Sequence, residues 1–175
     1  MRRISELIGT KLKWVQPSAL KMHYELRAGD DLAASLHFRS SFGSFATAES
    51  EDGCWTFKRV GFWQTRVTIR PCGTNNDIAN FINNTWSGGG TLEIPDGRRI
   101  LANTNFWQTK YEFKIDPGET LVEFETGGLI HLSANVEIKP RAATMPELPL
   151  MVMLGWYLVV MMHMDSSAAS VVIVG

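Results

Sequence analysis

Few residues of this chain have the types and the spacing that catalysis or metal binding requires. The four histidines are scattered, and none has a metal-site spacing to Cys, Asp or Glu. His163 and Asp165 come closest, but residues two apart on a helix face different directions. No serine lies in a nucleophile elbow, and the glycines at 88–90 precede a strand pattern instead of the Lys-Ser/Thr of a phosphate loop. We therefore predict no catalytic residue, no metal ion and no cofactor.

The two cysteines and the N-terminus indicate the compartment. Cys54 and Cys72 form no Cys-x-x-Cys motif, and two cysteines are too few for a disulfide scaffold. We therefore expect reduced, buried thiols. The first residues are basic but lack the apolar run of a secretory signal. Together these features predict a cytoplasmic protein, and the basic arm could bring it to the periphery of a membrane.

Five cations could form a site for an anion. Arg66 and Arg70 alternate with apolar residues, and Lys110 and Lys114 do so 44 residues later. Lys58 belongs to a strand that we expect to be a neighbour. If the apolar side chains face inward, all five cations face outward, where they could bind phosphate or anionic headgroups. The alternative is a solvated exterior whose charges limit aggregation.

These cations belong to an internal repeat. Phe62-Trp63-Gln64-Thr65 recurs as Phe106-Trp107-Gln108-Thr109, and the pair at 52–53 recurs at 96–97 with the same offset of 44 residues. Each unit reads as two hairpins. We expect Trp63 and Trp107 to pack in the core, because aromatic platforms for single-stranded nucleic acid need basic residues on the same face.

The elements that must position these residues are short strands. Before residue 140 the chain alternates polar and apolar residues between Asp-Gly and Pro-Gly turns, a pattern that predicts an antiparallel sheet. The expected strands are 20–26, 32–38, 45–50, 54–60, 65–70, 91–94, 98–102, 110–115, 121–125 and 129–138. A propeller has a similar repeat, but it needs about four blades and this chain has room for three. A closed barrel of about twelve strands fits the length and leaves no exposed edges.

Residues 148–162 read LPLMVMLGWYLVVMM and predict a helix over about 146–164. The helix is apolar on every face, so it must be surrounded by protein or by lipid. The uncharged run is shorter than the roughly 20 residues of a typical membrane span, so burial inside the barrel is our prediction and a transmembrane span the alternative. Gly155 would let a strand approach closely. The β-branched end of the chain predicts a last strand at 168–174.

This order of elements resembles the tubby C-terminal-like superfamily, which includes tubby proteins, phospholipid scramblases and LURP-one-related proteins. The resemblance lies in the strand WTFKR at 55–59 and in the helix at 148–162 followed by SSAASVVIVG. It implies one mainly β domain over 1–175, with strands over about 18–139 and a closed antiparallel barrel of about twelve strands around a buried hydrophobic C-terminal α-helix. Tubby proteins bind phosphoinositides through basic groups on the outer barrel wall.

The predicted function is a non-enzymatic binding module that associates with anionic phospholipid headgroups at a membrane surface. The candidate binding residues are Lys58, Arg66, Arg70, Lys110 and Lys114. The alternatives are a protein–protein adaptor, a structural barrel, and a hydrolase whose site is built from separate strands. With 17 basic and 18 acidic residues the net charge is −1, which disfavours nucleic acid as a partner. The expected partners are therefore anionic phospholipids or another protein.

Overall fold

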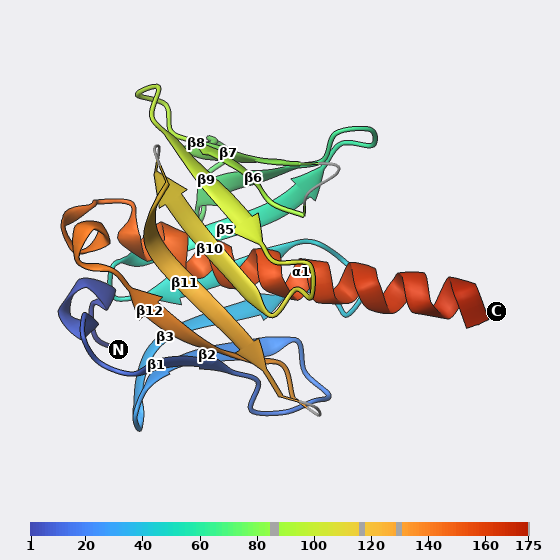
Figure 1. Ribbon diagram of the computed structural model, residues 1–175, viewed down its shortest axis with the longest axis horizontal. Helices are drawn as coiled ribbons and strands as arrows, with labels where there is room; N and C mark the ends of the chain where they lie inside the picture. The colour runs from blue at the N-terminus through green and yellow to red at the C-terminus, as the bar shows by residue number, and fades with distance from the viewer. Residues whose placement is uncertain (85–87, 116–117, 129–130, 175) are drawn as a thin grey trace.

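The structure is a computed structural model that describes residues 1–84, 88–115, 118–128 and 131–174, with side chains through residue 169. In this part of the chain, twelve antiparallel strands close into a barrel in sequence order, as the sequence predicts (Figure 1). The strands are β1 (Leu12–Val15), β2 (His23–Ala28), β3 (Asp31–Phe38), β4 (Ala46–Ser50), β5 (Gly53–Val60), β6 (Arg66–Pro71), β7 (Ala79–Asn83), β8 (Gly90–Glu93), β9 (Arg99–Thr104), β10 (Lys110–Ile115), β11 (Glu119–Gly127) and β12 (Ser133–Ile138).

The barrel wall follows the period-two pattern of the sequence. On β10, for example, Tyr111 and Phe113 are buried in the lumen, whereas Lys110 on the same strand is exposed. The prediction that the branched and aromatic residues face inward is therefore confirmed for this strand. The expected strand at 129–138 is β12 from Ser133 onward, and residues 129–130 lie outside the described part of the chain.

Two strands of the barrel were not expected. β7 follows an irregular connection, and β1 has only four residues. β1 closes the barrel because it pairs with β2 on one side and with β12 on the other. Its Trp14 is fully buried and stacks on Trp156 of the central helix, with the ring centroids 5.7 Å apart. This packing fixes a short strand whose period-two pattern would be weak by itself.

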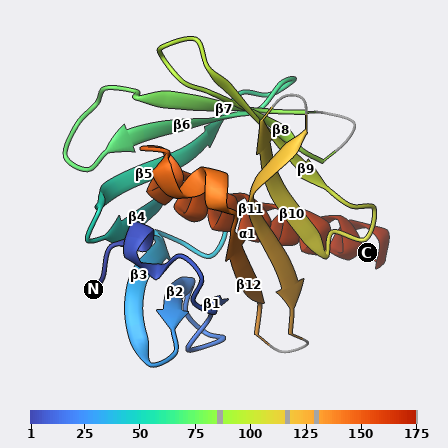
Figure 2. The ribbon, with the colours of Figure 1, turned by 60° about the vertical axis from the view of Figure 1, so that its left-hand side comes forward.

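Helix α1 (Leu148–Val174) runs through the barrel, as Figure 2 shows. The predicted burial is confirmed, because the described side chains from Leu148 to Met161 are almost fully removed from solvent, Pro149 excepted. The close approach at Gly155 is also confirmed. A Cβ there would overlap the ring of Phe124 on β11 and lie 3.0 Å from the ring of Phe113 on β10.

The predicted last strand at 168–174 is wrong, because α1 continues through Val174. The twelve strands already close on one another through the pairing of β1 with β12. A closed barrel has no free edge to which another strand could be added. The C-terminal segment therefore continues as a helix beyond the lumen.

The expectation of reduced thiols is also wrong in this structure, because Cys54 and Cys72 form a disulfide. Cys54 lies on β5 and Cys72 directly follows β6. The Cys72 N–H donates to the Cys54 carbonyl at 3.0 Å, which places the two residues opposite each other on paired strands. Their Cα atoms are 5.4 Å apart, within the range that a disulfide spans. The pairing of β5 with β6 brings the thiols together, and spacing alone could not show this.

Candidate functional site

The two ends of the barrel are built differently. Because consecutive strands run up and down, every second connection lies at the same end. One end, which we call the loop rim, consists of the connections 16–22, 39–45, 61–65 and 105–109 and of the described residues in the connections 84–89 and 128–132. The other end, the turn end, contains the remaining connections and the start of α1. The helix enters at the turn end and leaves through the loop rim (Figures 1 and 2).

The loop rim carries two exposed aromatic pairs at the tips of equivalent hairpins. Phe62 and Trp63 lie between β5 and β6, and Phe106 and Trp107 between β9 and β10, each with 78% to 88% of its surface exposed. Both pairs have the same T-shaped geometry, with centroid separations of 5.3 Å and 5.1 Å. The prediction that Trp63 and Trp107 pack in the core is therefore wrong.

These aromatic side chains are exposed because the strand ladders end before they reach them. The last pair of the β5–β6 ladder is Val60 with Arg66, so Phe62 and Trp63 lie beyond the sheet and cannot point into the lumen. Gly61, with a φ of 94°, begins the turn. The sequence contained one usable signal, a glycine directly before the repeated FWQT segment in the first copy. A glycine at this point favours a turn over a continuing strand.

Other rim loops extend this apolar surface. Leu20 in the β1–β2 loop and Phe42 in the β3–β4 loop are 95% and 98% exposed. Of the eight large hydrophobic side chains exposed in the described part of the chain, six therefore lie on the loop rim, and Met1 and Leu101 are the others. Single exposed apolar residues are ordinary, but a group at one end marks an interaction surface.

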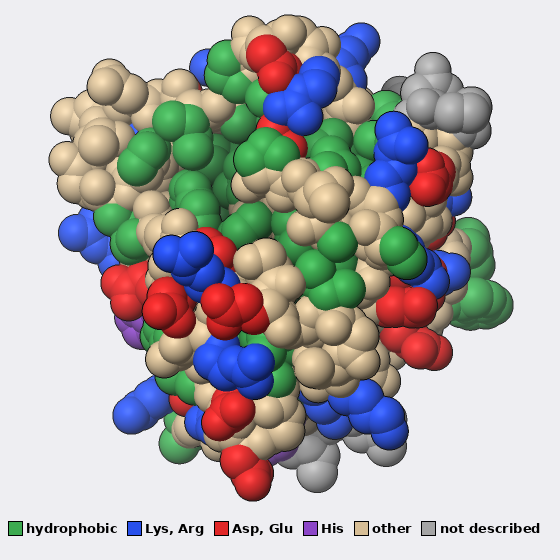
Figure 3. Space-filling model, turned by 90° about the vertical axis from the view of Figure 1, so that its left-hand side faces the viewer, with side chains coloured by type: hydrophobic (Ala, Val, Ile, Leu, Met, Phe, Trp, Pro, Cys, Tyr) green, Lys and Arg blue, Asp and Glu red, His purple; other side chains and the backbone are tan. Residues whose placement is uncertain are grey.

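The charge of the two ends also differs. The six rim loops contain no Asp or Glu, whereas Lys21 and Arg39 are exposed there. Arg66 is exposed directly after the first aromatic tip. The connections of the turn end carry carboxylates at Asp30, Glu51, Asp52, Asp77 and Asp96. Seen from the turn end, basic and acidic side chains are interspersed (Figure 3).

Specific contacts hold α1 to the loops where it leaves the barrel. The Tyr157 hydroxyl donates to the Ser44 carbonyl at 2.6 Å. The Arg59 guanidinium donates to both carboxylate oxygens of Asp165 at 2.6 Å and 3.0 Å. The hydrogen bond with Asp165 raises the pKa of Arg59, and burial raises the pKa of Tyr157. Both groups therefore keep their ordinary protonation states at neutral pH.

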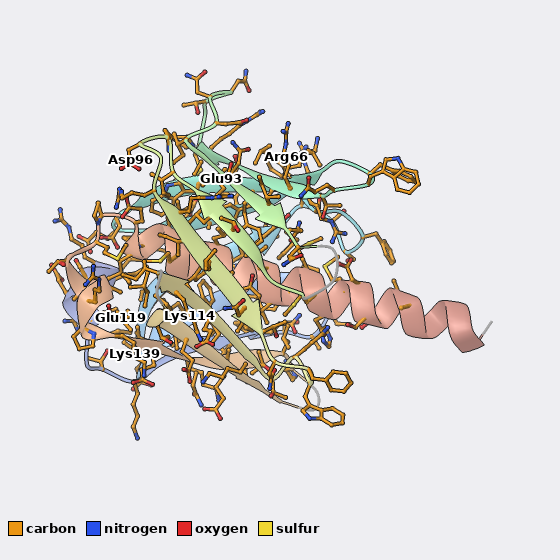
Figure 4. All side chains as sticks on the ribbon, turned by 45° about the horizontal axis from the view of Figure 1, so that its top comes forward. Arg66, Glu93, Asp96, Lys114, Glu119 and Lys139 are labelled. Atoms are coloured by element: carbon orange, nitrogen blue, oxygen red, sulfur yellow. A yellow bond between two sulfur atoms is a disulfide. The ribbon has the colours of Figure 1, made fainter. Side chains whose placement is uncertain are left out.

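The structure separates the five predicted cations into two groups. Lys58, Arg66 and Arg70 lie on the paired strands β5 and β6. Lys110 and Lys114 lie on β10, four strands away in the barrel order. Figure 4 shows Arg66 and Lys114 on different parts of the wall. The equivalent positions of the sequence repeat are therefore not one continuous patch.

Several of these cations are paired with carboxylates. Lys110 Nζ lies 3.0 Å from a Glu123 oxygen, and Lys114 Nζ lies 2.9 Å from Glu112. The hydrogen bond with Glu123 raises the pKa of Lys110. Arg70 pairs with Asp77 at 2.6 Å. Among the described residues, Lys58 and Arg66 form no ion pair, so these two of the predicted residues present uncompensated charge.

The described residues were also searched for a metal site and for a helix that could span a membrane. They contain no group of three or more His, Cys, Asp or Glu side chains that could hold a metal ion. Within the same residues, one helical segment, Leu148–Ala169, is long and apolar enough to cross a membrane, although most of it is buried in the barrel. The alternative of a membrane-inserted helix therefore concerns the part of α1 beyond the rim.

Comparison with known proteins gave no match to a family model, a curated protein or a solved structure. The closed twelve-stranded antiparallel barrel with its C-terminal helix is consistent with a tubby-like barrel fold.

Proposed function

We propose that this chain is a non-enzymatic module that docks on an anionic phospholipid membrane through its loop rim. The observation that carries the proposal is the exposure of Phe62, Trp63, Phe106 and Trp107 around the point where α1 emerges. We further propose that the chain is a tubby-like barrel related to the LURP-one-related and scramblase-like proteins. It would bind peripherally to the cytoplasmic face of a membrane.

The rim has the composition of a surface that enters the membrane interface. Tryptophan and phenylalanine favour this region, where an aromatic ring can contact both acyl chains and headgroups. Between Asp165 and the end of α1 at Val174 there is no charged residue, and this segment, SSAASVVIV, finishes with four apolar residues. The emerging helix and the aromatic tips can therefore enter the same interfacial layer without burying a charge.

Electrostatic attraction supports an anionic surface. Lys21 and Arg39 lie on the rim and Arg66 next to it, and the described residues of the rim loops include no carboxylate. Each basic residue near an anionic leaflet contributes about 1 kcal/mol at moderate salt. Lys110 and Lys114 contribute less to this attraction because their partners Glu123 and Glu112 compensate their charge.

Flotation with vesicles tests the proposal. The wild type should float with vesicles that contain phosphatidylserine more than with neutral vesicles. A variant with Phe62, Trp63, Phe106 and Trp107 changed to Ser should remain in the soluble fraction. Leu101→Ser is the matched control, because Leu101 is also exposed but lies on β9, outside the rim loops. Equal flotation of the wild type and the four-site variant would contradict docking by the rim and leave a protein partner as the better explanation.

The basic residues are tested separately. Changing Lys21, Arg39 and Arg66 to Glu should abolish the preference for anionic vesicles, and wild-type binding should fall when the salt concentration rises. Arg99→Glu is the control, because Arg99 is exposed at the turn-end start of β9. If the triple variant kept the wild-type preference for anionic vesicles, the electrostatic part of the proposal would be wrong.

A further inference from the structure

A cleft of about 850 Å³ opens on the loop rim beside the emerging helix. It lies between α1 and the loops 16–22 and 39–45. Its wall combines residues of both loops with residues of the last buried and first exposed turns of the helix. The lining includes Gln16, Met22 and Phe42 from the loops and Val160, Met164 and Ala168 from α1.

The deep part of the cleft is apolar and uncharged. Tyr24, Val160 and Met161 are buried, and the partly buried Met22 and Met164 widen this floor. The Tyr24 hydroxyl donates to the Met22 sulfur at 3.8 Å. Burial raises the pKa of Tyr24 to about 12, so this phenol is neutral at physiological pH. The floor therefore suits a ligand without charge or hydrogen-bonding groups at its deep end.

Polar residues lie at the mouth. Gln16 and the exposed His163 are there, together with the ion pair between Arg59 and Asp165. Because Arg59 donates to both oxygens of Asp165, the charges of this pair compensate each other. The mouth thus offers hydrogen bonds without a large net charge, next to the exposed ring of Phe42.

We infer that this cleft binds one acyl chain of a lipid taken from the membrane on which the loop rim docks. The inference rests on the proposed function. The volume of the cleft is in the range of small-molecule sites, about 300–1,000 Å³. The thioethers of Met22, Met161 and Met164 can adapt to a flexible chain. A peptide would need partners for its backbone N–H and C=O groups, and the apolar floor offers few.

The position of the cleft favours a membrane source. It opens on the rim, between two loops that carry the exposed residues Leu20 and Phe42. When these side chains lie in the interface, an acyl chain can slide from the bilayer into the cleft without crossing bulk water. The headgroup would then remain at the mouth, near Gln16 and His163.

Binding of the fluorescent fatty acid cis-parinaric acid below its micelle concentration tests the inference. Ala168→Trp should fill the cleft from an exposed helix position and weaken binding of the probe at least about tenfold. Ser166→Trp is the matched control, because Ser166 lines a smaller cleft on another side of α1. Met164→Trp is a second filling variant from the wall of the cleft. Equal affinity in the wild type and both filling variants would overturn the site.

The same proteins separate this inference from the proposed function. Ala168→Trp should float with anionic vesicles at least as well as the wild type, because the aromatic tips are unchanged and the tryptophan added to the emerging helix also favours the membrane interface. Flotation of the wild type without binding of the probe would overturn the acyl-chain site and leave the docking proposal standing. Binding of the probe without flotation would overturn a membrane source. Displacement of the probe by lysophosphatidylcholine should match that by palmitate, and displacement by palmitate alone would likewise overturn a membrane lipid as the source.

Discussion

The turn end and the loop rim are built by the same twelve strands, but they have opposite surfaces. At the turn end, the short helices η1 (Ile4–Leu7) and η2 (Pro140–Thr144) lie beside the start of α1. The Ile4 N–H donates to the Asp52 carboxylate at 2.8 Å, and Arg98 pairs with Glu147 directly before α1. At the loop rim, no comparable short helix covers the barrel among the described residues, and aromatic side chains project into solvent.

This difference shows which residues the fold requires and which it leaves available. The fully buried aromatic side chains and α1 stabilise the barrel, whereas the exposed rim residues bury little surface within the protein. Substitutions at the rim should therefore change binding without changing stability. Substitutions in the core or near the turn end should change stability without changing binding. Four predictions test this contrast, from the largest effect to the smallest.

The largest effect is expected inside the barrel. Gly155→Leu would force a side chain into the rings of Phe124 and Phe113. Overpacking of this kind destabilises proteins by about 1–3 kcal/mol and occasionally more, and we expect the upper part of that range in urea unfolding. Ala168→Leu, at an exposed position of the same helix, is the control. A Gly155→Leu protein with the wild-type unfolding midpoint would contradict the close packing of α1 against β10 and β11.

The disulfide should have a comparable effect. The bond between Cys54 and Cys72 closes a loop of similar length to those for which the chain-entropy model gives about 3 kcal/mol. Reductant should therefore lower the melting temperature of the wild type but not that of a double Cys→Ser variant. Disulfides are rare in the cytosol, so alkylation of thiols in intact cells also tests the proposed location. Two readily alkylated thiols in the native protein would restore the reduced state that the sequence predicts.

Single changes at the rim test the equivalence of the two hairpin tips. Trp63→Ala and Trp107→Ala should each weaken vesicle binding, by roughly tenfold if each ring is buried in the interface. Their effects should be similar because both rings have the same position in the repeat and the same T-shaped partner. The free energy of unfolding of each variant should change by less than about 0.5 kcal/mol. A large effect of one variant and none of the other would show that the barrel docks on one side of the rim.

The smallest effect is expected in the dependence of stability on acidic pH. At the turn end, hydrogen bonds from Arg98 hold the pKa of Asp96 below its ordinary value of 3.8. A depressed pKa in the folded state adds stability above the unfolded pKa, and this contribution is lost as the pH falls through the folded pKa. Asp96→Asn should therefore be slightly less stable than the wild type at pH 7, and this difference in stability should disappear as the pH falls through the folded pKa of Asp96. Asp30→Asn, another turn-end carboxylate, is the control, and a stability difference that persists at low pH would contradict this assignment.

Much of the architecture could be predicted from local patterns. The alternation of Lys110, Tyr111 and Phe113 indicates a strand with one buried face, and the structure has this strand. The run from Leu150 to Met162 is apolar all round, and only complete enclosure can accommodate such a helix. The offset of 44 residues between the two FWQT segments indicated a repeat of hairpins, and the structure places both segments in equivalent connections, one between β5 and β6 and one between β9 and β10.

The candidate site was harder to predict because it depends on where ladders end. The ladder of β5 and β6 ends at the pair of Val60 with Arg66, so Trp63 lies in the connecting turn and not in a strand that faces the lumen. The five predicted cations illustrate the same difficulty. Equivalent positions in a repeat become neighbours only if the strands are adjacent, and β6 and β10 are not.

The sequence by itself determined an antiparallel β protein with an internal repeat and one helix that must be enclosed, because these features follow from periodicity and from the cost of exposing apolar surface. The tertiary structure decided how the barrel closes, which thiols meet and which end carries the aromatic side chains. Closure requires β1 to pair with β12, more than a hundred residues away, as in the pair of Leu12 with Val136. That pairing leaves no edge for a thirteenth strand, so α1 continues past the loop rim as a helix to Val174.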